Sequence, residues 1–61
     1  MQVTYELFLK NGGYEFITQY KYRTKEEAVD KAMRLNNELT LKGKTDRKYV
    51  VYKVTMEEVK F

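Results

Sequence analysis

The chain has 61 residues and a formal net charge of +3, and it contains no cysteine, histidine, tryptophan or proline. Without cysteine it can form no disulfide and no thiolate metal site, and without histidine a transition-metal centre loses its commonest ligand. We therefore expect no metal and no cofactor. A chain of this length makes one domain, residues 1–61, and such a small core often needs a partner for stability.

The first third of the chain has the period of two β-strands. Residues 2–10 alternate between apolar and polar side chains, and residues 14–23 alternate again. A period of two predicts strands with one buried face. The segment between them, Asn11-Gly12-Gly13, is typical of a hairpin turn because these residues tolerate positive φ. The side chains that we expect on the buried face are Val3, Tyr5, Leu7 and Leu9, then Tyr14, Phe16, Thr18, Tyr20 and Tyr22.

The turn allows two hairpin registers. With Asn11-Gly12 at the tip, Leu7 would lie opposite Phe16; with Gly12-Gly13 at the tip, Phe8 would lie opposite Ile17 and Lys10 opposite Glu15. Both registers keep the apolar faces together, since they differ by two residues. The second gives better cross-strand pairs, and we favour it.

A helix is predicted from about residue 25 to residue 42. Apolar side chains recur there at the helical period and make a one-sided stripe, formed by Ala28, Ala32, Leu35 and Leu39 and widened by Val29, Met33 and Asn36. Thr24 and Glu27 have the spacing of a capping box at the helix start. Gly43 can adopt the left-handed conformation that ends a helix.

A third strand is predicted over residues 48–56. We expect Val50, Tyr52, Val54 and Met56 to face the helix, and Tyr49 and Val51 to face the other way. The tail, residues 57–61, is left open: it could extend this strand, fray, or dock on a neighbouring molecule.

The elements give an α+β fold of order ββαβ, with two layers. A right-handed crossover that skips one strand puts the first strand in the middle of an antiparallel sheet of order 2-1-3, with the helix on one face. The alternative is the order 1-2-3, with a parallel pair.

One helix covers only one face of such a sheet. The uncovered face is expected to carry Phe8, Ile17, Tyr49 and Val51 side by side, and monomers seldom expose a patch of this kind. We expect a homodimer or higher homo-oligomer formed through this face or a sheet edge, or a protein partner bound there. The alternative is that these are scattered exposed hydrophobic residues that bind nothing.

Five cations are expected to gather where the helix ends: Lys10, Lys42, Lys44, Arg47 and Lys48. Such a cluster could bind nucleic acid or a nucleotide through phosphate. The alternative is that these cations only interact favourably with the negative end of the helix dipole and bind no ligand.

The residue types in the chain argue against an enzyme and against a membrane-spanning protein. Without histidine, cysteine or serine, an enzyme would need a strongly tuned group in a shaped pocket, which one helix on three strands has little interior to build. No apolar run reaches membrane-spanning length, and no signal-peptide pattern opens the chain, so we expect a cytoplasmic protein. In size, missing residue types and richness in Lys, Glu, Tyr and Asn, the chain resembles small accessory proteins of phages or mobile elements, although no motif is involved.

The functional hypothesis is therefore a non-enzymatic binding protein, an inhibitor or adaptor that occupies a surface of another macromolecule. The alternative is an anion binder that uses the basic cluster. A third possibility is that the patch only closes a dimer and that the polar face of the helix binds the partner.

Overall fold

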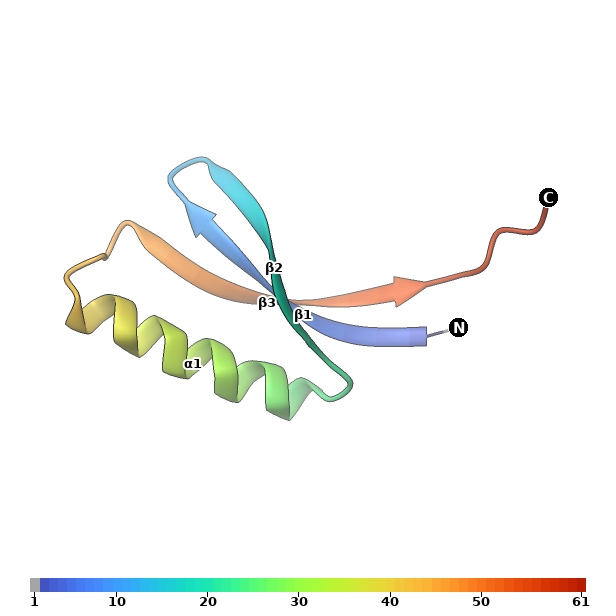
Figure 1. Ribbon diagram of the computed structural model, residues 1–61, viewed down its shortest axis with the longest axis horizontal. Coiled ribbons are helices and arrows are strands. Elements are labelled where there is room, and N and C mark those ends of the chain that lie inside the picture. Colours follow the sequence, from blue (N-terminus) through green and yellow to red (C-terminus); the bar gives the residue numbers. More distant parts are fainter. Residues whose placement is uncertain (1) are drawn as a thin grey trace.

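The computed structural model describes residues Gln2–Phe61 and has the predicted α+β architecture (Figure 1). The elements are β1 (Gln2–Asn11), β2 (Tyr14–Tyr22), α1 (Lys25–Leu41) and β3 (Arg47–Met56). They form one antiparallel sheet of order β2-β1-β3, so the alternative order with a parallel pair is wrong. Within the described residues, no helix combines the length and the apolar content needed to cross a membrane.

The hairpin turn has Gly12-Gly13 at its tip. Lys10 lies opposite Glu15 and Phe8 opposite Ile17, which is the register that the cross-strand pairs favoured. Gly12 has a φ of 63° whereas the φ of Gly13 is not positive, and this is the φ pattern of a type II′ turn. Glycine is needed at the first of these positions because other residues rarely adopt positive φ.

A register shift interrupts the pairing of β1 and β2. Glu6 pairs with Lys21 and Phe8 with Ile17, so three residues of β2 lie opposite the single residue Leu7. The hydroxyl of Thr18 replaces the missing ladder bond: it donates to the carbonyl of Leu7 at 2.5 Å and accepts the amide of Tyr20 at 3.2 Å. Because the excess is two residues, each strand keeps its faces across the bulge.

Both ends of α1 are capped by the predicted residues, although Thr24 and Glu27 form only half of a capping box, since the carboxylate bonds to the Thr24 hydroxyl and not to its backbone amide. At the start, the Thr24 hydroxyl accepts the amide of Glu27 at 3.3 Å and donates to the Glu27 carboxylate at 2.8 Å. At the end, Gly43 has a φ of 72°, its amide donates to the Thr40 carbonyl, and the amide of Lys44 donates to the Leu39 carbonyl. These two bonds are those of a Schellman motif, which directs the chain back toward β3.

The core is small because only three hydrophobic side chains of the described chain are buried: Leu7, Ala28 and Ala32. The two alanines let α1 approach the sheet closely over Leu7. A ring of half-buried side chains surrounds them, formed by Tyr5, Tyr20, Tyr22, Leu35, Tyr49 and Val51. Tyrosines suit this margin, since the ring packs inward while the hydroxyl stays in water.

The prediction for the faces of β3 was wrong. Leu7 pairs with Val51 and Leu9 with Tyr49, so Tyr49 and Val51 lie on the helix side with the core. The opposite parity of β3 lies on the uncovered face: Val50, Tyr52, Val54 and Met56. The alternation of side chains could not show which face of β3 is turned toward the helix, because apolar residues occupy both faces of this strand.

Asn36 fixes the orientation of β3. Its side-chain oxygen accepts the Tyr49 amide at 2.7 Å, and its side-chain nitrogen donates to the Tyr49 carbonyl at 2.9 Å. The side-chain amide of Asn36 thus bonds to the outer edge of β3 as a neighbouring strand would. In agreement with this, α1 packs chiefly against β3 (Figure 1). Met33, which the helical stripe placed in the core, is 67% exposed instead.

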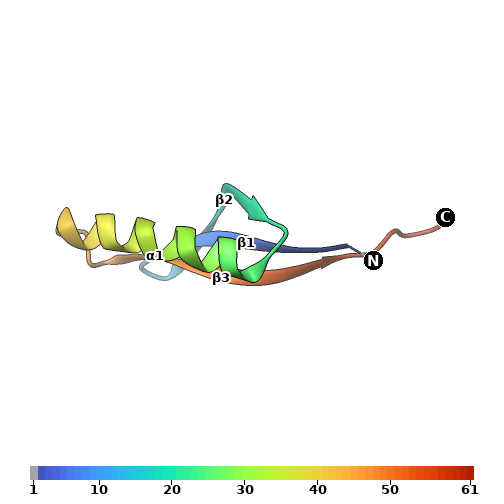
Figure 2. The same cartoon turned by 90° about the horizontal axis from the view of Figure 1, so that it is seen from below.

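The molecule is flat and extended, with dimensions of 48 × 25 × 13 Å (Figure 2). Its radius of gyration is 13.4 Å, whereas a compact chain of this length has about 10.5 Å. Its accessible surface is 5228 Å², against about 4,200 Å² expected for a folded monomer of this mass. The excess comes to roughly 1,000 Å², and Figure 1 shows one source of it: β1 and β3 extend past the start of α1.

Candidate functional site

The uncovered sheet face carries an apolar patch whose membership differs from the prediction. We define this open-face patch as Phe8, Ile17, Val50, Tyr52 and Val54. Phe8 lies at its centre, opposite Ile17 of β2 and Val50 of β3. Phe8 and Ile17 are therefore where the sequence placed them, and Val50, Tyr52 and Val54 take the positions expected for Tyr49 and Val51.

Tyr52 lies across this patch and connects all three strands. Its ring meets the ring of Phe8 edge to face, with centroids 5.1 Å apart and planes at 83°. Its hydroxyl donates a hydrogen bond to the carboxylate of Glu15 on β2. This hydrogen bond, with smaller contributions from desolvation and from the negative charge of Glu15, raises the pKa of Tyr52 above its ordinary value. The aromatic pair is thus held in one geometry.

One carboxylate on the open face is buried and has its partners within the chain. Glu6 is only 9% exposed and lies between Lys21 of β2 and Tyr52 of β3. The Thr4 hydroxyl donates to its carboxylate at 2.8 Å, and the Lys21 ammonium lies 3.9 Å away. A buried charge needs such partners, and these account for Glu6 without an external ligand.

The border of the open-face patch carries charges of both signs. Lys10 faces Glu15 on one side, at 3.8 Å, and Lys48 on the other. Ile17 is the most exposed member of the patch, at 77%. An exposed aliphatic side chain within a mixed-charge rim is typical of a protein-binding surface.

Three of the five cations predicted to gather at the helix C-terminus share a pocket. Lys44, Arg47 and Lys48 line a cavity of 280 Å³ together with polar side chains of α1 and the following loop, namely Asn36, Thr40 and Thr45. Lys42 and Lys10 do not line it. The Nε atom of Arg47 is buried without a hydrogen-bond partner in the described chain, and Asp46 approaches it only to 3.9 Å. The pocket could therefore hold an anion.

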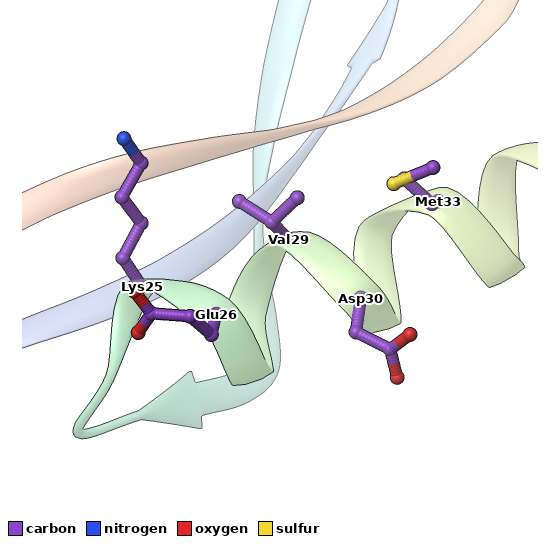
Figure 3. A pocket seen from close by; sticks show the side chains of 5 residues that line it. All are labelled: Lys25, Glu26, Val29, Asp30 and Met33. Atoms are coloured by element: carbon purple, nitrogen blue, oxygen red, sulfur yellow. The ribbon is translucent and has the colours of Figure 1, made fainter.

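A groove between α1 and the helix-facing side of β1 and β3 was not predicted. One part has a volume of 490 Å³ and is lined by Tyr5, Lys25, Val29, Val51 and Lys53. It adjoins a second hollow of 370 Å³ on α1, where Val29 and Met33 project to the side on which β3 passes, whereas Asp30 points away (Figure 3). The sequence signal was the pair Val29 and Met33, one helical turn apart, which the helical stripe assigned to the core.

Among residues 2–61, no three carboxylate, histidine or cysteine side chains gather as a metal site would require. No protein-family model matches this chain, and neither a curated protein nor a solved structure matches it. The features of the described chain that can bind a partner are the open face, the basic pocket and the groove.

Proposed function

We propose that this chain is a small non-enzymatic binding protein that acts as an inhibitor or adaptor by occupying a surface of a partner protein. The observation that carries the proposal is the open-face patch, Phe8, Ile17, Val50, Tyr52 and Val54, which no element of the described chain covers. An apolar centre with aromatic side chains and a polar rim is the usual anatomy of protein interfaces. The proposal includes self-association, a cytoplasmic location and a role like that of phage accessory proteins.

The open face suits a protein partner better than nucleic acid. Its border carries Glu15 beside Lys10, so it offers no continuous positive track for a phosphate backbone. The ring of Tyr52 is engaged with Phe8 and its hydroxyl with Glu15. Base stacking would need those aromatic faces to be free.

Site-specific photo-crosslinking tests this function. A benzophenone amino acid at Ile17, in an extract of the cells that make the protein, should give a discrete crosslinked product with a second protein. Leu41 provides the matched control, since it is similarly exposed but lies at the end of α1. The product should persist at high salt, because apolar contacts are not screened, and Val50→Asp should abolish it. Identical products from positions 17 and 41 would contradict the proposal.

Anion binding is the second candidate function, and the observation that favours it is the unpartnered Nε atom of Arg47 in the basic pocket. Arginine presents a planar fork that matches phosphate, whereas lysine acts as a point charge. Under this alternative, NMR titration with inorganic phosphate or a short single-stranded DNA should shift the Arg47 and Thr45 signals. Affinity should fall steeply with salt and be lost in Arg47→Gln. Unshifted signals would exclude it.

A further inference from the structure

The outer edge of β3 is unpaired beyond Tyr49. The Asn36 bonds establish that the amide and carbonyl of Tyr49 point away from β1. Because these groups alternate along a strand, those of Val51, Lys53 and Thr55 point to the same outer side. Over residues 51–56 no strand of the described chain pairs with this edge, and such an edge is a ready template for pairing with another chain. Val51 and Lys53 of the same stretch also line the groove.

The groove next to β3 is lined by apolar and cationic side chains. Val51 and Lys53 share the face of Tyr49, and both line the groove with Val29 and Lys25 of α1. Met33 extends the apolar lining along the helix (Figure 3). A strand laid along β3 would therefore place alternate side chains against Val29 and Met33, which is the arrangement of β-strand addition beside a helix.

The segment that follows β3 has the side chains that such a groove requires. Glu57–Phe61 makes no strand of its own and extends away from the body of the molecule (Figure 1). Val59 is 77% exposed and Phe61 fully exposed, and they alternate with Glu58 and Lys60. This tail cannot reach the groove of its own chain, because it continues β3 in the opposite direction.

We propose that the groove binds the tail of a second copy of this chain, in a symmetric dimer. The two β3 edges pair antiparallel about Thr55, and each tail continues as an added strand along the β3 edge of the other copy. The pairing sets Lys53 opposite Glu57 and Val51 opposite Val59, and it joins two three-stranded sheets into one of six strands. The proposal deepens the self-association part of the proposed function and leaves the open-face patch free for another protein.

Among the registers centred on a residue whose backbone groups point outward, the side chains favour this one. Residues whose backbone groups point outward must pair with one another, so only shifts of two residues are allowed. Pairing about Lys53 would set the two lysines face to face, and pairing about Glu57 would do the same with two glutamates. Like charges directly opposite are destabilising. Pairing about Thr55 instead joins opposite charges and apolar side chains, and it ends where Asn36 already occupies the edge at Tyr49.

The large accessible surface of the monomer is consistent with dimer formation. The elongated chain leaves roughly 1,000 Å² more surface in water than a compact monomer of this mass, so it has surface available for an interface. Pairing also satisfies the edge groups of Val51, Lys53 and Thr55 and covers Val59, which the isolated chain leaves in water.

Charge reversal tests the proposed pairing by sedimentation equilibrium. The wild type should have twice the chain mass of 7.4 kDa at sufficient concentration. Lys53→Glu and Glu57→Lys should each weaken dimerisation roughly tenfold or more, because symmetry repeats every altered pair. The double variant should recover the wild-type dissociation constant. Lys60→Glu is the matched control, since this residue lies on the other face of the tail and should change nothing.

The same measurement separates this proposal from the proposed function. Ile17→Asp should leave the dissociation constant unchanged, and dilution of the wild type should speed amide exchange at Val51, Lys53 and Thr55. The pairing is overturned by a monomer at the highest soluble concentration, by a double variant no tighter than the single ones, or by a dimer that Ile17→Asp dissociates. The last result would assign the open-face patch to self-association instead.

Discussion

Replacement of Asn36 by alanine tests what holds β3 in place. This side chain makes two hydrogen bonds to Tyr49, at 2.7 and 2.9 Å, and joins α1 to the edge of the sheet. Asn37 is its natural control, because it follows directly in the same helix and is exposed. Alanine gains the same helix propensity at either position. The difference between the two variants therefore isolates the bonds to β3.

The expected magnitude follows from those two bonds. Each is worth about 1 kcal/mol net, so Asn36→Ala should be about 2 kcal/mol less stable than Asn37→Ala. A chain of this length has a total stability of roughly 3–9 kcal/mol. The loss is therefore a large fraction of the whole, and the melting temperature of Asn36→Ala should lie roughly 10 °C below that of Asn37→Ala.

Thermal and urea denaturation followed by circular dichroism measures the difference directly. Asn36→Asp adds a second comparison, because it keeps the acceptor for the Tyr49 amide but sets an oxygen against the Tyr49 carbonyl, so it should also be destabilised. If Asn36→Ala and Asn37→Ala have the same melting temperature, the bonds to Tyr49 do not hold the strand, and Asn36 does not determine the orientation of β3.

Two further predictions concern the core and the open face. Leu7→Ala should cost about 2–5 kcal/mol in urea denaturation, because Leu7 is fully buried, whereas the exposed Leu41→Ala should change stability by less than about 0.5 kcal/mol; equal effects would mean that the core lies elsewhere. In a spectrophotometric titration, Glu15→Gln should lower the pKa of Tyr52 toward its ordinary value of 10.0. Since the protonated phenol makes the bond, its stabilisation is present below pH 10.0 and is lost as the pH rises through the raised pKa; identical titrations of variant and wild type would contradict this.

Local chemistry was enough to predict the helix, the hairpin and its register. The turn residues Gly12-Gly13, the cap Thr24 and the terminator Gly43 each act within a few residues of themselves. The strand order followed from chain direction and crossover handedness, which are general rules. For the same reasons, Leu7 was correctly placed under the helix and Phe8 on the open face.

The orientation of β3 could not be predicted because it depends on one long-range contact. Val50 and Val51 offer equally apolar alternatives, so the period of the strand does not distinguish its faces. The orientation is determined by Asn36, whose place at the margin of the apolar stripe, which it widens, gave no indication that its amide would bond to Tyr49, thirteen residues away. Half of the predicted patch, Tyr49 and Val51, was wrong for this reason.

The central position of β1 has a consequence for how the protein is made. Gln2 pairs with Met56 and Asn11 with Arg47, so synthesis must proceed into residues 47–56 before β1 gains its second neighbour. Until then the nascent chain can form only the hairpin and a helix with nothing to close the sheet. Pairing between such distant segments is intrinsically slow and leaves strand edges open to aggregation. When the protein is overproduced, slower translation or a co-produced chaperone should therefore increase the yield of folded protein, because both protect the open strand edges until β3 emerges.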